Sequence, residues 1–553
     1  MDLYTFDCGC SFPAHSDKTS KTFPKTSLPS IEFSIENINN ECERTWDMIC
    51  EGRTKGVFQL ESNLGKSWAK RLKPRNIEEL AALCALIRPG CLKAIVGGKS
   101  MTQHYVDRKH GREKVEYLDP CLEPILKPTQ GVLVYQEQSM KIAQVVAGFD
   151  LQQADDLRKA IGKKKADLME KVKKSFLEGA SSKGIVTDEV AEEIFSWIEK
   201  SNRYAFNKSH AISYAIDGYW SAYAKSHFPH NFFCSYLYHA DGKQDSQQEI
   251  KDLIGECKLF DIEVQQPDIA DLSKRFDIRD KTIYFGINNL KSVGEKQADK
   301  ICESVKLAES ALGKKVGEFS WIDCLIMVID KINNTSAKAI ISSGVLSSIA
   351  KGVSRNRMLY ETEIWKKLTI KEKEWICDRM ENFDSLEGVL VKLKPTKKEG
   401  GGTHNHKRKE IIEGEIYHLQ NPPYDLSDDP EWVAMEEEKI LGCPITYSKV
   451  DSCDTSSTNS TCKEIFNGRR GASIIAVSIN RINNYKIKRG KSKGQNMAFL
   501  SVEDSSCELD DVIIFPEALE KNKDLLYQGN TVLLSGSVEK KDDAFIIKKV
   551  SQI

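Results

Sequence analysis

Two groups of cationic side chains between Gly131 and Tyr214 have the composition of a phosphate-binding surface. These cations and the aromatic residue that follows them are Arg158, Lys159, Lys163, Lys164, Lys208, His210 and Tyr214. Cations bind phosphate oxygens through charge-assisted hydrogen bonds, and aromatic rings stack on bases. The combination predicts a site that holds the triphosphate of a nucleotide.

Less specific interpretations of this stretch stay open. A run of lysines such as Lys163–Lys165 is commonly a solvated helix face, and His210 could be a structural hydrogen-bond donor. Asp155 and Asp156 are expected in the first turn of a helix, where negative charge suits the helix's positive end.

Composition excludes several classes of protein. No apolar run reaches membrane-spanning length, and the N-terminus lacks a basic segment followed by an apolar one, so we expect neither a membrane protein nor a secretion signal. Sixteen cysteines, mostly single, predict reduced thiols in a cytoplasm. Because 80 basic and 81 acidic residues nearly cancel, nucleic-acid binding requires positive charge gathered on one face.

Two short segments contain residues that bind metals. Cys8 and Cys10, with His15 nearby, could begin a metal site, but no second Cys-x-x-Cys pair follows. We therefore expect unpaired thiols and no metal. His404 and His406 stand beside three glycines, which predicts a solvated loop.

Hydrophobic periodicity predicts a multidomain, mainly α protein that ends in an all-β barrel. The irregular N-terminal segment is followed by a helical domain, a region with a hairpin around 279–281, a helical segment containing the polar linkers 394–410 and 447–468, and the barrel. The ranges are 1–41, 42–239, 240–350, 351–468 and 469–553. Five short strands, with a helix after the third, suit an OB-type barrel.

Two further segments could contact DNA. The first is a tight turn that leads into a helix, and it contains Lys291, Ser292, Val293, Gly294 and Lys296. Its backbone N–H groups could face a phosphate, or it could be an ordinary helix cap. The second segment follows the first barrel strand and contains Lys486, Lys488, Arg489 and Lys491. OB barrels use this region to bind single-stranded nucleic acid, although these charges could also belong to an ordinary solvated loop.

Six motifs in this order resemble the fingers domain of the C-family replicative DNA polymerases, the DNA polymerase III alpha subunits. They are Val57–Ser62, Leu86–Gly90, Asp107–Arg112, Tyr135–Gln138, Leu157–Lys164 and Phe206–His210. The resemblance continues through Gly286–Gly294, similar to the family's helix-hairpin-helix, and through Met497–Asp504, similar to its OB domain.

The resemblance implies roles for these segments. The cations of the fingers, with Tyr214, would meet an incoming dNTP. The helix-hairpin-helix would hold primer–template DNA by its backbone, and the OB domain would lie near single-stranded template. A sliding clamp is a possible further partner, and Gln420–Leu426 is the nearest candidate for a clamp-binding peptide.

The chain departs from the family at the catalytic centre. The family's palm uses an Asp-x-Asp pair and a third Asp to bind two Mg²⁺ ions, and no Asp-x-Asp occurs here. The histidine motifs of the family's PHP domain are also missing. Asp7, in a Phe-Asp pair ahead of Val57–Ser62, is the one candidate for the third carboxylate, which would make 1–41 a remnant of the palm edge.

These departures suggest a split bacterial or phage polymerase whose PHP domain, palm carboxylates and Mg²⁺ belong to another chain. On this hypothesis the chain is inactive alone. The alternative is a non-catalytic DNA-binding accessory protein derived from the same scaffold. A helical protein whose terminal barrel binds RNA or another protein is a third, less specific interpretation.

Overall fold

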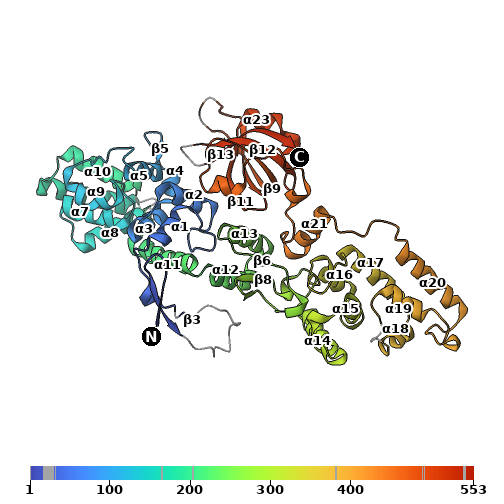
Figure 1. The fold of residues 1–553 in the computed structure, drawn as a ribbon. Coiled ribbons are helices and arrows are strands. Elements are labelled where there is room, and N and C mark those ends of the chain that lie inside the picture. The colour runs from blue at the N-terminus through green and yellow to red at the C-terminus, as the bar shows by residue number, and fades with distance from the viewer. Residues whose placement is uncertain are drawn as a thin grey trace. The chain divides into compact units, whose positions relative to one another are not determined.

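The computed structural model describes residues 2–15, 30–31, 33–163, 166–201, 205–379, 383–488, 490, 492–539 and 544–553. Figure 1 shows these residues as a ribbon. They form two units, which we describe separately. The first unit contains the described residues up to Pro229, and the second contains those from His230 onward. No helix within the described ranges is long and apolar enough to span a membrane.

The first unit begins with a small antiparallel sheet in the segment predicted to be irregular. Its strands are β1 (Asp2–Thr5), β2 (Ser11–His15) and β3 (Ser30–Ile31). Gly9, with φ +80°, allows the tight turn between β1 and β2, because this backbone conformation costs glycine little. The strands are too short to produce a clear period of two, which explains the difference from the prediction.

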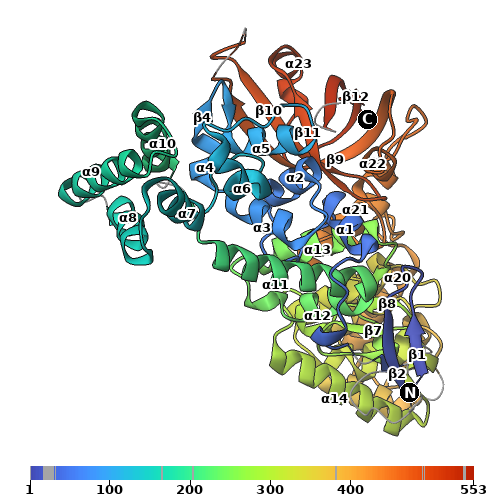
Figure 2. The same cartoon turned by 90° about the vertical axis from the view of Figure 1, so that its left-hand side faces the viewer.

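Helix α11 (Lys208–His227) packs against α3 (Ile77–Leu86) in the first unit (Figure 2). All residues from Leu80 to Leu86 are buried, so α3 lies within the core. Small residues on α11, among them Ala211, Ala215 and Ala222, are buried as well and permit close approach. The shorter elements of this part are α1 (Glu43–Cys50), α2 (Asn63–Leu72), α4 (Pro89–Lys93), β4 (Ile95–Val96), β5 (Lys99–Ser100), α5 (Met101–Lys109) and α6 (Glu123–Leu126).

Four further helices of this unit surround a second core. They are α7 (Gln136–Ala147), α8 (Leu151–Lys163), α9 (Ala166–Lys183) and α10 (Asp188–Ser201). Phe176, Phe195 and Ile142 are buried at its centre. Helices α7 and α9 approach closely at Gly179, where a Cβ atom would lie 2.2 Å from the carbonyl oxygen of Ala147.

The second unit begins with helices around a large apolar core. They are α12 (Pro229–Tyr238), α13 (Ser246–Leu259), α14 (Glu295–Leu312), α15 (Trp321–Met327), α16 (Asn334–Ser342), α17 (Arg355–Lys366), α18 (Ile370–Cys377), α19 (Leu386–Leu393), α20 (His406–Gln420) and α21 (Pro430–Leu441). Strand β6 (Val264–Gln265) pairs with β8 (Thr282–Tyr284), which also pairs with β7 (Asp277–Arg279). This confirms the predicted hairpin, and Asp280 and Lys281 have the positive φ values of a two-residue hairpin turn.

The two predicted polar linkers contain regular structure. In 394–410, Gly401, Gly402 and Thr403 are buried and α20 begins at His406. His404 and His406 are exposed, in keeping with the prediction of solvated histidines. In 447–468, a short helix, α22 (Cys462–Phe466), begins with a capping box. Polar composition suggested loops because the first of these ranges includes only the start of α20, and α22 has only five residues.

The C-terminal strands form a closed barrel, which confirms the predicted OB-type fold. The strands are β9 (Ala472–Lys486), β10 (Asn496–Glu503), β11 (Glu508–Ile514), β12 (Thr531–Val538) and β13 (Phe545–Gln552), with α23 (Pro516–Lys521) between the third and fourth. Among the described residues they close in the order β10-β11-β13-β12-β9. The β11–β13 pair is parallel and the other pairs are antiparallel, as this Greek-key topology requires.

A buried ion pair joins α17 to α21 in the second unit. Arg355 lies 2.8 Å from Glu437, and the two side chains are 8% and 0% exposed. Glu437 also accepts hydrogen bonds from the backbone N–H groups of Ile445 and Thr446, each at 2.7 Å. A buried charge that loses its partner is strongly destabilising.

Glu437→Leu should therefore destabilise the second unit by about 3–5 kcal/mol, because it leaves the Arg355 guanidinium buried without its counter-ion. Urea unfolding of the full chain, followed by tryptophan fluorescence, measures the change. Glu436→Gln on the same helix is the control. It disrupts only an exposed pair with Lys439 and should cost less than about 1 kcal/mol. Equal losses in the two variants would contradict the prediction.

Candidate nucleotide and nucleic-acid interface

Two predicted motifs meet where α7 and α11 begin. Tyr135 and Phe206 form a parallel β-bridge. The Gln136 N–H donates to the Phe206 carbonyl and the Phe206 N–H donates to the Val134 carbonyl, each at 2.9 Å. The Tyr135–Gln138 motif and the Phe206–His210 motif are therefore held side by side by main-chain hydrogen bonds.

The first turn of α11 is capped by side chains. Glu137 accepts hydrogen bonds from the Lys208 N–H at 2.9 Å and from the Asn207 amide at 2.8 Å. Asn207, the N-cap residue, accepts a hydrogen bond from the His210 N–H at 2.8 Å. Because a carboxylate already meets this helix terminus, a phosphate here would be held by side chains rather than by these amides.

Aromatic and cationic side chains from four motifs surround the start of α11. The Arg88 guanidinium lies 3.8 Å from the centre of the Phe206 ring. The rings of His210 and Tyr214 lie 3.9 Å apart, and the Phe58 ring lies 5.0 Å from Tyr214. The ammonium group of Lys208 lies 6.0 Å from the Tyr135 ring. We name the group formed by Phe58, Arg88, Phe206, Lys208, His210 and Tyr214 the α11 surface.

The α11 surface includes residues that sequence reasoning did not assign to the site. Lys208, His210 and Tyr214 were predicted, whereas Phe58 and Arg88 were recognised only as parts of motifs. The Phe58 carbonyl would lie 3.0 Å from a Cβ atom at Gly218, so this glycine allows the Phe58 loop to rest on α11. Their presence in two of the six motifs was the sequence signal for Phe58 and Arg88. Only the fold shows that these side chains lie against the residues of α11.

The second group of cations lies on α8 and is paired with acids. Asp155 lies 2.8 Å from Arg158 and 2.7 Å from Lys159. Hydrogen bonds from Lys159 and Arg158 hold the pKa of Asp155 below its usual value. Asp155 lies beyond the first turn, contrary to the prediction, because α8 begins at Leu151 and Asp150 caps it by accepting from the Gln153 N–H.

Two further cations of this group follow Lys159 in the sequence. Lys163 ends α8, while Lys164 lies outside the described residues. Helix α8 packs against α7, whose first turn carries Glu137 and contacts the start of α11. The α8 cations and the α11 surface thus share α7 as a support, and their joint role in nucleotide binding stays a prediction.

The predicted turn before α14 presents open backbone donors. Ser292 has a φ of +77° and Val293 is buried beneath the turn. Lys291 and Lys296 are exposed, and α14 has no side-chain N-cap hydrogen bond. Within the described residues, the N–H groups of Gly294, Glu295 and Lys296 have no acceptor. This geometry suits a phosphate at the helix N-terminus.

The barrel carries exposed aromatic rings beside its basic loop. Lys486 and Lys488 are exposed, and Arg489 and Lys491 lie outside the described residues. Tyr485 on β9 and Phe499 on β10 are 43% and 39% exposed, and their rings lie 6.3 Å apart. Sequence reasoning missed this pair because it placed Lys486 in a loop after the first strand, whereas β9 continues to Lys486 and pairs there with β10.

Asp7 is distant from the α11 surface. It is exposed in the turn between β1 and β2, directly before Cys8, whose Sγ lies 3.2 Å from His227 Nε2 at the end of α11. Lys208 begins that helix, and a helix of this length spans about 30 Å. Asp7 is therefore not part of the α11 surface in this structure, and its catalytic role stays a prediction.

Comparison with known proteins shows what this chain is similar to. Residues 18–184 match the bacterial DNA polymerase III alpha subunit finger domain, and residues 261–358 match a helix-hairpin-helix motif. Aligned over 94% of the chain, the DNA polymerase III alpha subunits of Aquifex aeolicus, Borreliella burgdorferi and Escherichia coli are 32%, 31% and 30% identical to it. Over nearly its whole length, the chain is therefore similar to part of the DNA polymerase III alpha subunits.

These two matches confirm the predicted fingers and helix-hairpin-helix regions. The match covers 40% of the Aquifex protein and 42% of the Borreliella and Escherichia proteins. The chain thus spans less than half of the length of these relatives. The predicted domain boundaries and the roles of individual site residues stay predictions.

Tyr485→Ala or Phe499→Ala should weaken binding of the chain to oligo(dT) by about 1–3 kcal/mol, because each ring offers one stacking surface to a base. Fluorescence anisotropy at several salt concentrations measures the change. The dependence on salt should stay the same, since no phosphate contact is lost. Tyr527→Ala, which removes another exposed aromatic residue, is the control, and an equal loss there would contradict a specific stacking pair.

Proposed function

We propose that this chain holds the incoming dNTP and the primer–template DNA of a replicative DNA polymerase. The observation that carries the proposal is the α11 surface, where three separate motifs of a polymerase fingers domain converge. It places a lysine, a histidine and an arginine among aromatic rings, the combination that suits a triphosphate attached to a base. The names of the relatives support the same activity.

Each surface has a distinct part in this proposal. Lys208 and His210 bind the triphosphate together with the α8 cations, and the Tyr214 ring stacks on the base. The open turn before α14 binds the backbone of duplex DNA, which positions the duplex without reading its sequence. The barrel's aromatic pair and basic loop bind the single-stranded template.

The catalytic carboxylates and Mg²⁺ are proposed to come from another chain. Two-metal catalysis requires several carboxylates around both ions, and no Asp-x-Asp pair occurs in the sequence. Among the described residues, the one group of three or more potential metal ligands contains no carboxylate. The residues present therefore do not fit the family's Mg²⁺ site. The partner would be a polymerase chain with palm and PHP domains, and a sliding clamp could join the complex in the cytoplasm.

The purified chain should bind primed template but fail to extend the primer when given Mg²⁺ and dNTPs, because the ligands for the two ions are missing. Extension should begin when the palm-bearing chain from the same genome is added. Gel electrophoresis of a labelled primer measures both reactions. Extension by the chain alone would contradict the split arrangement. Failure of every palm-bearing chain to restore synthesis would favour a non-catalytic accessory protein.

Lys208→Ala and Arg158→Ala should each raise the KM for dNTP in the reconstituted enzyme by about tenfold or more, since a charge-assisted hydrogen bond contributes about 1.5–3 kcal/mol. Affinity for primed template, measured by anisotropy, should stay within twofold of the original value. Lys127→Ala removes an equally charged but exposed side chain of the same unit and serves as the control. A parallel loss of DNA affinity would show that these cations bind DNA instead.

A further inference from the structure

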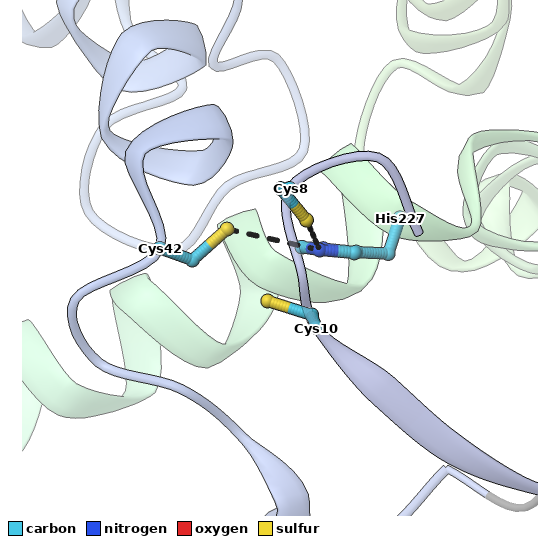
Figure 3. Close-up of side chains that lie close together, drawn as sticks. All are labelled: Cys8, Cys10, Cys42 and His227. Atoms are coloured by element: carbon cyan, nitrogen blue, oxygen red, sulfur yellow. Dashed lines mark hydrogen bonds between the residues drawn. The ribbon is translucent and has the colours of Figure 1, made fainter. Parts of the chain in front are cut away.

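Four potential metal ligands converge at the end of α11 (Figure 3). Cys8 and Cys10 come from the turn between β1 and β2, Cys42 is the N-cap residue of α1, and His227 is the last residue of α11. The sequence predicted unpaired thiols with His15 as the nearest histidine. The structure instead adds Cys42 and His227, which no spacing rule connects to the first two.

The distances within this group suit a tetrahedral metal ion. His227 Nε2 lies 3.2 Å from Cys8 Sγ and 3.7 Å from Cys42 Sγ. All four ligand atoms lie within 4.8 Å of one another. Around a zinc ion, tetrahedral geometry separates nitrogen from sulfur by about 3.5 Å and sulfur from sulfur by about 3.8 Å. The observed group needs only small side-chain adjustments to reach these values.

The orientation of His227 is the second observation that points to a metal. Its Nδ1 lies 3.0 Å from the Tyr223 carbonyl and 3.0 Å from Ser226 Oγ. The carbonyl can only accept, so Nδ1 carries the proton and the Nε2 lone pair faces the thiols. A ligating histidine normally has this arrangement, with its second nitrogen donating to a fixed acceptor.

The shape of the Cys8–Cys10 turn also suits metal binding. The Phe6 N–H donates to the Cys10 carbonyl at 2.9 Å, and the Gly9 N–H donates to the Phe6 carbonyl at 2.8 Å. These bonds close a tight turn that directs both thiols toward Cys42 and His227 (Figure 3). Cys10, Cys42 and His227 are only 5%, 2% and 4% exposed.

An apolar shell surrounds the group. The ring of Tyr223 stacks on His227 at 4.0 Å, and Phe6 approaches it edge-on at 4.9 Å. Buried cysteines often act as small hydrophobic residues, but that role does not require an imidazole with its lone pair directed at the thiols. A closed set of three sulfurs and one nitrogen is instead typical of structural zinc sites.

We propose that Cys8, Cys10, Cys42 and His227 bind one zinc ion, which ties the N-terminal hairpin to α1 and α11. All four positions around the ion belong to the protein, which is the arrangement of a structural site rather than a catalytic one. Soft thiolate ligands favour zinc over Mg²⁺. The proposal goes beyond the polymerase function and does not depend on it.

The test begins with the metal content of the full chain, purified without chelator and without added metal. Mass spectrometry of the digested protein should find about one zinc per chain. Replacement with Co²⁺ should produce the visible absorption of tetrahedral cobalt and near-ultraviolet charge-transfer bands from three thiolates. Less than about one zinc per ten chains, together with no such cobalt spectrum, would overturn the proposal, because a structural site retains its ion.

Variants assign the ligands. Cys10→Ser and Cys42→Ser should each lose most of the zinc and lower the cobalt charge-transfer intensity. Cys377→Ser, which changes an exposed thiol on α18, is the matched control and should retain both. Equal zinc loss in the control would place the ion elsewhere. If a ligand variant fails to fold, the metal content and cobalt spectrum of the unchanged chain still decide the question.

Hydrogen exchange tests what the ion does. Removing zinc with a strong chelator should raise amide exchange within residues 2–15, while exchange in the barrel strands stays unchanged. Restoring zinc should reverse the effect. Exchange in 2–15 that does not respond to removal of a bound ion would overturn the tethering role.

Discussion

The burial of α11 against α3 is the constraint on which the first unit depends. Small residues on α11 allow the two helices to approach, and Lys225, fully buried, donates hydrogen bonds to the carbonyls of Arg53 and Lys55 at 3.0 and 2.8 Å. These bonds satisfy a buried ammonium group with backbone oxygens and hold the loop that carries Phe58. One helix therefore positions the α11 surface at its start and the cluster of Cys8, Cys10, Cys42 and His227 at its end.

Electrostatics moderates the proposed nucleotide surface. Arg158 and Lys159 are paired with Asp155, and Glu137 meets the start of α11. An anion that binds here must displace or share these acidic partners, so part of each new hydrogen bond replaces an existing one. The arrangement keeps cations ordered before a ligand arrives and limits indiscriminate binding of phosphates. It also agrees with a chain whose total charge is close to zero.

Local patterns predicted the fold where neighbouring residues determine it. Alternating apolar residues from Ser473 onward predicted the barrel, and Arg279-Asp280-Lys281 predicted a hairpin, because strands and turns follow short-range rules. The α11 surface was predicted in part, since Lys208 and His210 share a motif. Arg88 could not be assigned from sequence, because its contact with Phe206 depends on how α3 and α11 pack.

The cluster of Cys8, Cys10, Cys42 and His227 was not predicted, because its ligands lie far apart in the sequence. Cys8 and His227 are separated by most of the first unit in sequence, and zinc motifs are recognised from sequence only when ligands are closely spaced. Strands β1 and β2 are only four and five residues long, and a small hairpin is only marginally stable alone. A metal at Cys8 and Cys10 would supply the stability that this hairpin lacks. It would also fix Asp7 at the end of α11 opposite Lys208, and among the described residues the one group of potential metal ligands does not include Asp7.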